Sequence, residues 1–374
     1  MRLRLPRSHV LGFAPVLLLS AVVSAQPVRI FHDRDPAVLA RLSDDARAAL
    51  GTPGLSAAIV VGEAVVWAQG FGLADVEQNA PVRPESVFRI ASISKPITAT
   101  AVLQLVERGL VSLDDPIQRF VPSFPRKPQG EIRLRHLLTH TSGIRHYRGN
   151  EMNSREFYPT VERALGVFRD DPLLFAPGEQ YFYTTYGYNL LAAVVEAASG
   201  RSFDDYLRQN VFGPAGMTST FLERPQEVVR WRARQYVRTP LPGTWFNAPY
   251  VDLSVKWAGG GMISSTLDLA RFDMALNGGR LLKPEALDRM YTSGRLNSGA
   301  YTGYGLGWMI SQEAGRLRVA HSGGATGGST FMLREPQSRL ATVLLANADN
   351  VPRLRDLAEQ LLALAPRPSP TSTR

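Results

Sequence analysis

The stretch RIASISKPITATAVLQLVERG, Arg89 to Gly109, places Ser92 three residues before Lys95 at the start of a predicted amphipathic helix. Residues three apart share one face of a helix, so the hydroxyl and the amine can meet without help from the rest of the chain. Apolar residues at helical spacing predict that this turn packs against a core: Ile90, Ile93, Ile97, Ala101, Val102 and Leu105. Desolvation of the Lys95 amine is therefore expected.

The Ser92 and Lys95 pair is suited to nucleophilic catalysis. A serine hydroxyl needs a neighbouring base, and a lysine can be that base when burial or nearby charge lowers its pKa. Pro96 fits the first helical turn because the backbone N–H groups there have no intrahelical acceptor. The N–H of a nucleophile at a helix start can also stabilise an oxyanion. The alternative is an ordinary helix cap beside a solvated lysine, since S-x-x-K pairs also occur by chance.

Two further segments carry residues suited to acyl transfer. Tyr183 lies in PGEQYFYTT, a loop before a predicted helix, and His321 ends a predicted strand in VAHSGGATGG. A tyrosine near a lysine can act as base and then as acid, and small residues let a substrate backbone lie along a strand. Serine, lysine, tyrosine and histidine together suffice for acyl transfer, so neither a metal nor an organic cofactor is expected.

The two ends of the chain are rich in predicted strands, and the middle is helical. LSAAIVVG and AVVWAQGFG predict a hairpin near the N-terminus, and RLRVAHSGG, STFMLREP and RLATVLLANA predict three strands near the C-terminus. Capping residues and breakers predict helices at 35–50, 186–199, after Ser202, near Thr266, from Pro284 and at 352–364. We expect an α+β fold with a five-stranded antiparallel sheet flanked by helices and an inserted helical subdomain.

This organisation predicts one large domain between two terminal segments. The domain is expected at 26–365, with an α/β part at about 35–115 and 255–365 and a helical part at about 116–254. The last residues, 366–374, form a tail that is predicted to be disordered.

Composition narrows the class of protein. With 374 residues and 44% hydrophobic content, the chain can bury a sizeable core. The absence of cysteine excludes disulfides, thiolate metal sites and thiol nucleophiles. The formal charge of +9 is scattered along the chain, so nucleic-acid binding is not expected.

The N-terminus, MRLRLPRSHVLGFAPVLLLSAVVSAQ, has the pattern of a secretory signal peptide. A basic start, an apolar run from Leu11 to Val23 and small residues at 23–25 predict cleavage after Ala25. The alternative is a mitochondrial presequence, because the segment has three arginines and no acids. No later apolar run approaches the roughly 20 residues of a spanning helix, so we expect a secreted or periplasmic protein without a membrane span.

Several motifs, in a fixed order, carry a family resemblance. They are FRIASISKPITA, LRHLLTHTSGIRHY, PGEQYFYTT, GPAGM, GGGMISSTLDLARF, YGLGW and HSGG. The chain resembles, from about Leu55 to Ala348, the penicillin-binding serine β-lactamase-type hydrolases, which include class C β-lactamases and D-Ala-D-Ala carboxypeptidases. RIASISK, SGIRHY and HSGGATG are especially similar to the mitochondrial serine β-lactamase-like members. The resemblance implies a peptidase-like hydrolase with the β-lactamase/transpeptidase fold.

The resemblance also implies catalytic roles. Ser92 would be the acylated nucleophile, Lys95 its proton acceptor, and Tyr183 the second general base that later activates the deacylating water. Tyr186, in YGYN, competes for the tyrosine role, but it does not keep the family's spacing from the Pro-Gly pair at 177–178. We therefore assign the tyrosine role to Tyr183.

The strand motif and the oxyanion hole follow from the same resemblance. His321, Ser322 and Gly323 would occupy the motif that is Lys-Thr-Gly or His-x-Gly in relatives, with His321 supporting the tyrosine. The N–H groups of Ser92 and Gly324 would form the oxyanion hole.

Thr185 departs from the family pattern. The family has Tyr-x-Asn where this chain has Tyr183-Thr184-Thr185. An asparagine both donates to and accepts from a substrate amide, whereas threonine is shorter and offers one hydroxyl. The departure leaves recognition of a β-lactam acylamide side chain open.

Three other features were weighed as sites. His136 and His140 have a spacing that can bind zinc, but HLLTH lacks the glutamate of H-E-x-x-H and a third ligand, which favours a structural role. Trp257 is the one tryptophan that we expect near a substrate pocket, although large aromatics more often fill cores. The glycine runs at 259–261 and 303–307 indicate turns and tight packing rather than phosphate binding.

The sequence therefore predicts an exported serine hydrolase that forms an acyl-enzyme on a peptide, amide or ester substrate. One alternative is a true β-lactamase or D-Ala-D-Ala carboxypeptidase. Another, from a different class, is a non-catalytic binding or self-assembling module with the same fold. A small-molecule or peptide substrate is the expected partner.

Overall fold

The computed structural model describes residues 36–241 and 243–367. The predicted signal peptide, 1–25, lies outside these residues, as does most of the predicted tail. Within the described part of the chain, no helix combines the length and the apolar character needed to cross a membrane.

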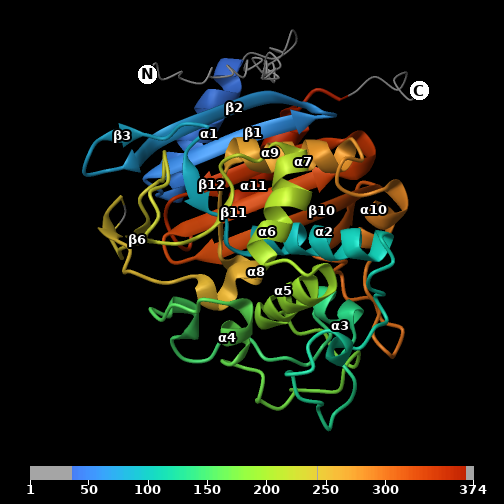
Figure 1. Cartoon of the computed structure of the whole chain (residues 1–374). Coiled ribbons are helices and arrows are strands. Elements are labelled where there is room, and N and C mark those ends of the chain that lie inside the picture. The colour runs from blue at the N-terminus through green and yellow to red at the C-terminus, as the bar shows by residue number, and fades with distance from the viewer. Residues whose placement is uncertain (1–35, 242, 368–374) are drawn as a thin grey trace, which may run out of the picture.

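A seven-stranded antiparallel sheet forms the upper half of the molecule in Figure 1, in the order β3-β2-β1-β12-β11-β10-β9. Its strands are β1 (Gly54–Val61), β2 (Ala64–Asp75), β3 (Ala80–Pro81), β9 (Met309–Glu313), β10 (Arg316–Ala325), β11 (Gly328–Glu335) and β12 (Leu340–Ala346). The two ends of the chain meet at its centre, where β1 pairs with β12 from Leu55↔Ala346 to Val61↔Leu340.

The predicted α+β fold is confirmed, but the predicted number of five strands is wrong. All five predicted strands are present, as β1, β2, β10, β11 and β12. The two additional strands, β3 and β9, are short and lie at opposite edges of the sheet. Short edge strands have one paired neighbour and weak alternation, so sequence patterns indicate them poorly.

Helices cover both faces of the sheet. On one face, α1 (Pro36–Leu50) and α11 (Leu354–Leu364) pack an apolar cluster against the strands. On the other, α9 (Thr266–Asn277) contacts β1 and β12, and α10 (Pro284–Met290) lies toward the β10 side (Figure 1). The start of α9 at Thr266 and of α10 at Pro284 confirms the two predicted helix starts.

Four helices lie below the sheet in Figure 1: α3 (Leu134–Leu138), α4 (Val161–Leu165), α5 (Tyr186–Ser199) and α8 (Trp257–Gly260). Two others, α6 (Phe203–Leu207) and α7 (Gly213–Ala215), lie in front of the sheet, and α7 contacts α9. As predicted, α5 ends at Gly200, whose left-handed φ of 67° suits glycine. Ser202 then caps α6 by accepting a hydrogen bond from the N–H of Asp205.

Two small sheets complete the chain. One has the order β4-β8-β5, formed by β4 (Val87–Arg89), β8 (Met262–Ser265) and β5 (Phe221–Leu222). The other pairs β6 (Tyr236–Arg238) with β7 (Trp245–Asn247). Because β4 leads directly into the Ser92 turn, its pairing with β8 anchors that turn from one side.

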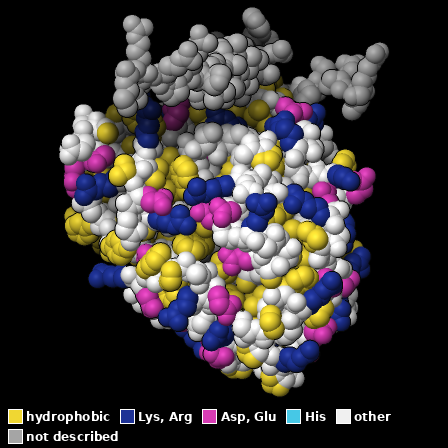
Figure 2. Space-filling view, in the orientation of Figure 1, with side chains coloured by type: hydrophobic (Ala, Val, Ile, Leu, Met, Phe, Trp, Pro, Cys, Tyr) yellow, Lys and Arg dark blue, Asp and Glu magenta, His cyan; other side chains and the backbone are white. Residues whose placement is uncertain are grey.

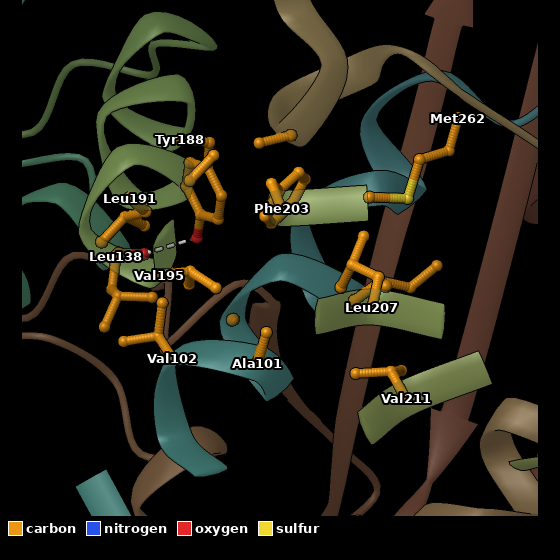
Figure 3. Packing of buried hydrophobic residues seen from close by; sticks show 14 of the residues in the cluster. Ala101, Val102, Leu138, Tyr188, Leu191, Val195, Phe203, Leu207, Val211 and Met262 are labelled. Carbon is orange, nitrogen blue, oxygen red and sulfur yellow. Dashed lines mark hydrogen bonds between the residues drawn. The ribbon is translucent and has the colours of Figure 1, made fainter. Parts of the chain in front are cut away.

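The helix that follows Ser92 is central and buried rather than amphipathic. Every residue of α2 (Ser94–Glu107) from Ser94 to Leu105 is buried, which contradicts the predicted amphipathic character. The reason is tertiary: α5 and α8 both pack against α2. Figure 3 shows Ala101 and Val102 of α2 beside Leu191 and Val195 of α5.

Candidate active site

The backbone around Ser92 is held in a strained and tightly packed turn. Ser92 lies in a single 3-10 turn, Ala91–Ile93, and Ala91 has a left-handed φ of 47°. A left-handed conformation costs a residue with a Cβ about 1–2 kcal/mol. The carbonyl of Ile90 accepts a hydrogen bond from Thr330 Oγ1 of β11, at 3.1 Å. The sheet therefore fixes the turn that presents the nucleophile.

Gly323 explains how β10 passes so close to this turn. A Cβ at Gly323 would overlap Thr330 Oγ1 and lie 2.6 Å from the carbonyl oxygen of Ile90. Glycine is the residue that permits such an approach between a strand and another backbone. The structure thus gives Gly323 a packing role, and its neighbours Ser322 and Gly324 are the residues that face the cavity.

Lys95 is buried, and its amine lies within hydrogen-bond distance of three oxygen atoms. Its amine lies 3.0 Å from Ser92 Oγ, 3.2 Å from Thr185 Oγ1 and 2.6 Å from the carbonyl oxygen of Gly259. None of the carboxylates in the described residues forms an ion pair with it. Burial, reinforced by the charge of Lys256, holds the pKa of Lys95 well below its usual value.

This arrangement fits a neutral amine. A neutral lysine has two N–H bonds and one lone pair. Thr185 Oγ1 and the Gly259 carbonyl can take the two N–H bonds, which leaves the lone pair for the Ser92 hydroxyl proton. The geometry can therefore remove a proton from Ser92.

Tyr183 lies beside this pair, as predicted. The Lys95 amine is 4.6 Å from the centroid of the Tyr183 ring. Burial raises the pKa of Tyr183 above its ordinary value, and hydrogen bonding to Ser92 opposes that rise. The phenol is therefore protonated in the resting site and adjacent to the nucleophile.

His321 reaches the site through a tyrosine that the sequence analysis did not select. Tyr304 Oη lies 2.9 Å from His321 Nε2, and His321 Nδ1 lies 2.7 Å from the carbonyl oxygen of Ser322. A carbonyl only accepts, so Nδ1 carries the proton and Tyr304 donates to Nε2. Burial and the nearby Lys95 lower the pKa of His321 to about 3. The ring centroids of His321 and Tyr183 are 6.2 Å apart.

These groups surround a cavity of about 370 Å³. Its lining comprises Ala91, Ser92, His146, Tyr147, Met152, Tyr181, Tyr183, Thr185, Lys256, Gly260, Met309, His321, Ser322 and Gly324. The lining includes six of the nine residues that the sequence analysis singled out as catalytic or substrate-binding; Lys95, Gly323 and Trp257 are the three outside it. It contains no aspartate or glutamate.

The outer edge of β10 is open next to this cavity. β9 pairs with β10 from Arg316 to Ala320 and no further, whereas β11 pairs with β10 as far as Ala325. The segment 321–325 therefore has one edge without a paired strand in the described chain. A peptide backbone can add to such an edge through main-chain hydrogen bonds. A Cβ at Gly324 would meet nothing within 4 Å, so the face of the strand is sterically open there.

The prediction for Trp257 is wrong. Trp257 is 6% exposed, belongs to the main apolar core, and is absent from the cavity lining. The neighbouring Lys256 lines the cavity instead, and its amine donates to the carbonyl of Met152 at 2.6 Å. Burial and the charge of Arg89 lower the pKa of Lys256 to about 7, against an opposing effect of Glu223.

The glycine run at 259–261 confirms the tight-packing interpretation. A Cβ at Gly259 would lie 2.5 Å from Thr185 Cγ2 and 2.7 Å from its carbonyl oxygen. This contact brings the Gly259 carbonyl within reach of Lys95. The glycine run at 259–261, which the sequence analysis assigned to tight packing, therefore also contributes a hydrogen-bond acceptor to the site.

His136 and His140 each accept a backbone N–H rather than facing one another across a metal. His136 Nδ1 accepts from the N–H of Arg133, and His140 Nδ1 accepts from the N–H of Thr184, both at 3.2 Å. In the described residues, no three histidine, cysteine, aspartate or glutamate side chains form a group that could hold a metal.

Four functional candidates were missed from the sequence: Lys256, His146, Tyr147 and Tyr304. His146 and Tyr147 lie in SGIRHY, and Tyr304 in YGLGW, two motifs that carried the family resemblance. These two motifs could have indicated that His146, Tyr147 and Tyr304 lie at the site. Lys256 has no local signature, because its position in the cavity depends on the fold alone.

The fold and the site together define a class. An antiparallel sheet with a helical region beside it, and a Ser-Lys pair faced by a tyrosine at their junction, are the features of penicillin-binding serine hydrolases. The chain belongs to the Beta-lactamase family, which it matches over residues 39–366.

Known relatives share this class. The mitochondrial serine beta-lactamase-like protein LACTB of Homo sapiens is 32% identical over 394 residues, covering 80% of this chain and 71% of the human protein. Esterase EstB of Burkholderia gladioli is 30% identical over 335 residues, covering 76% and 83%. The octameric penicillin-binding protein homologue from Pyrococcus abyssi superposes with a TM-score of 0.76 and 29% identity, covering 88% and 77%.

Proposed function

We propose that this protein is a serine hydrolase that cleaves esters, amides or peptide bonds through an acyl-enzyme on Ser92. The observation that carries the proposal is the buried Lys95 amine, 3.0 Å from Ser92 Oγ and without an ion-pair partner in the described chain. A lysine without a catalytic role is usually exposed to water or paired with a carboxylate, and Lys95 is neither. A lysine with a lowered pKa is the base that a serine nucleophile requires.

Acylation follows from the positions of three side chains. Ser92 Oγ attacks the substrate carbonyl carbon while its proton moves to the Lys95 nitrogen. The N–H groups of Ser92 and Gly324 stabilise the oxyanion in this proposal. The neutral Tyr183 phenol donates its proton to the leaving oxygen or nitrogen as the scissile bond breaks, and it regains a proton from the Lys95 ammonium.

Deacylation uses the same groups in reverse order. A water molecule gives a proton to Tyr183 and attacks the acyl carbon, while the Tyr183 proton passes to the neutral Lys95 amine. The Ser92 oxygen then leaves and takes its proton from the Lys95 ammonium. His321 lines the cavity, and Tyr304 holds its ring by a hydrogen bond of 2.9 Å. His321 stays neutral in this role, consistent with the lowering of its pKa to about 3 by burial and Lys95.

The environment of Thr185 favours esters and simple amides over β-lactams. Its hydroxyl already accepts from Lys95, at 3.2 Å. A threonine also lacks the amide that the family's asparagine offers to an acylamide side chain. We therefore expect turnover of p-nitrophenyl esters and amino-acid amides, and weak turnover of nitrocefin.

Covalent labelling tests the proposal. A fluorophosphonate and a penicillin are incubated with the wild type and with Ser92→Ala, and intact mass is measured. We expect a mass gain on the wild type with the fluorophosphonate and none on Ser92→Ala. No adduct on either protein would support the non-catalytic alternative. Parallel assays with p-nitrophenyl esters, nitrocefin and D-Ala-D-Ala peptides then rank the substrate classes.

We also propose export through the N-terminal segment. The basic start, the apolar run and the small residues at 23–25 support it. N-terminal sequencing of protein from a secreting host should begin at Gln26. An intact Met1 in the cytoplasmic fraction would contradict export.

A further inference from the structure

His140 holds the chain on both sides of Tyr183. Its carbonyl oxygen accepts from the N–H of Phe182 at 2.9 Å, and its Nδ1 accepts from the N–H of Thr184 at 3.2 Å. These two donors flank Tyr183 in the sequence. The loop that carries the catalytic phenol is therefore tied to one residue on either side.

The His140 ring also packs directly against Tyr183. Their ring centroids are 4.3 Å apart, and Tyr304 and Tyr188 follow at 4.6 and 5.3 Å. The two outer tyrosines are themselves fixed. Tyr188 donates to the carbonyl of Leu138 at 2.8 Å (Figure 3), and Tyr304 hydrogen bonds to His321. The His140 ring thus lies between Tyr183 and two tyrosines that are each held by a hydrogen bond.

This placement comes at a cost in stability. The φ of His140 is 59°, a left-handed conformation that is uncommon for a residue with a side chain. Nδ1 accepts an N–H, so the ring proton is on Nε2, and Nε2 is buried without a hydrogen-bond partner in the described residues. Strained backbone and unpaired buried polar groups are found mainly where function requires them.

The surroundings keep the ring neutral. The charged and titratable groups that face it are Lys95 of α2, His146, His321 of β10, and the phenols of Tyr181, Tyr183, Tyr188 and Tyr304. Burial first, and then Lys95, His321 and His146, hold the pKa of His140 well below its usual value. The Nδ1 lone pair therefore stays available for the N–H of Thr184.

We propose that His140 is a positioning residue for acyl transfer: it fixes the loop and the ring of Tyr183 against the Ser92 and Lys95 pair. This role rests on the proposed function. His140 touches neither the nucleophile nor the cavity, and it acts through Tyr183. It gives the second histidine of HLLTH a role that neither zinc binding nor simple packing describes.

Substitution of His140, with a matched control, tests the role. His140→Ala removes the acceptor and the ring, whereas His140→Asn keeps a short acceptor and tolerates a left-handed backbone. His136→Asn is the control, because His136 is also buried and accepts a backbone N–H, from Arg133 in the same short helical segment. Rates of fluorophosphonate labelling and kcat and KM for a p-nitrophenyl ester are measured for each protein.

We expect His140→Ala to lower kcat and the labelling rate by about 10- to 100-fold, with KM changed less than about 3-fold, since misplacement of a catalytic group affects the chemical step. His140→Asn should recover part of the loss. His136→Asn should stay within about 2-fold of the wild type. A folded His140→Ala or His140→Asn protein with wild-type kcat would overturn the role. If His140→Ala does not fold, His140→Asn decides.

A double-mutant cycle separates positioning from general destabilisation. If His140 acts through Tyr183, His140→Asn should change the residual labelling rate of Tyr183→Phe by less than about 2-fold. A loss that is fully additive in that background would refute action through Tyr183. The wild-type protein is the reference for the proposed function: absence of label there refutes the hydrolase, whereas a labelled wild type with unaffected His140 variants refutes only this inference.

Discussion

Two lysines lie at the site, Lys256 in the cavity wall and Lys95 behind Ser92, and the charge of Lys256 acts on Lys95. Lys95 hydrogen bonds to the nucleophile, and Lys256 binds the carbonyl of Met152 at 2.6 Å. The charge of Lys256 contributes to the lowered pKa of Lys95, after burial itself. The strand motif supplies no second cation, because His321 is neutral above a pKa of about 3. Lys256 is the one lysine or arginine among the described residues that line the cavity.

Removal of the Lys256 charge should shift the pH profile. Activity requires neutral Lys95, so kcat/KM rises as the pH rises through the pKa of Lys95. Lys256→Met removes a like charge and raises that pKa, which should move the acid limb of kcat/KM to higher pH by about one unit. Lys256→Arg keeps the charge and should leave the limb in place. An unchanged limb in Lys256→Met would show that burial alone sets the pKa of Lys95. A shift to lower pH would contradict the expected repulsion between the two lysines.

Substitution of the two candidate tyrosines should have opposite effects on turnover and stability. Tyr183 lies beside Lys95, whereas Tyr186 donates to Glu151 at 2.9 Å and stacks on Phe168. Tyr183→Phe should lower ester turnover by about 100-fold or more, the usual range for loss of a general acid or base. Tyr186→Phe should retain turnover and lose about 1 kcal/mol of stability with its hydrogen bond. Steady-state kinetics and urea unfolding of both variants give the comparison, and the reverse pattern would exchange the assignments.

At the scale of elements, two neighbouring glycines of β10 have different tasks. Gly323 lies against the Ser92 turn, where a Cβ would be 2.6 Å from the Ile90 carbonyl oxygen, whereas Gly324 has nothing within 4 Å of a Cβ. Gly323→Ala should push β10 away from the turn, destabilise the fold by about 1–3 kcal/mol and slow fluorophosphonate labelling.

Gly324→Ala is the steric control for folding. Its stability should stay within about 0.5 kcal/mol of the wild type, because the added methyl meets open space. Urea unfolding measures both variants. Equal stability of the two would mean that the strand and the turn can separate at little cost.

Local signals predicted several element boundaries. Gly200 and Ser202 marked the end of α5 and the start of α6, because capping depends on residues within one helical turn. The edge strand β9 and the full burial of α2 were not predicted. Both depend on neighbours that are distant in the sequence, which a local pattern does not contain.

At the scale of the whole molecule, ion pairs differ greatly in their expected contribution. Figure 2 shows acidic and basic side chains interspersed on the face in view. Arg89 and Glu223 form a different kind of pair: both are buried, 2.9 Å apart, and Arg89 also donates to the carbonyl of Thr326 at 2.8 Å. The ion pair joins β4, which leads into the nucleophile turn, to the residue that follows β5, and the bond to Thr326 joins β4 to the turn that follows β10.

Arg89→Met should destabilise the protein by about 3–5 kcal/mol, because it leaves a carboxylate buried without a partner. Arg355→Met is the control: its pairs with Glu313 and Glu359 lie at the surface, and each contributes less than about 1 kcal/mol. Urea unfolding compares the two variants. A similar small loss in both would mean that Glu223 becomes protonated or hydrated without cost.

The sequence by itself determined the Ser92 and Lys95 pair, the tyrosine loop, the helix caps and the five central strands, because each depends on spacing or capping within a few residues. Only the tertiary structure decided the protonation of Lys95, the position of Lys256 in the cavity wall and the burial of Trp257 in the apolar core. Lys95 meets acceptors that are 90 and 164 residues away in the chain. Burial and long-range contact set its pKa, and neither quantity is encoded in a local pattern.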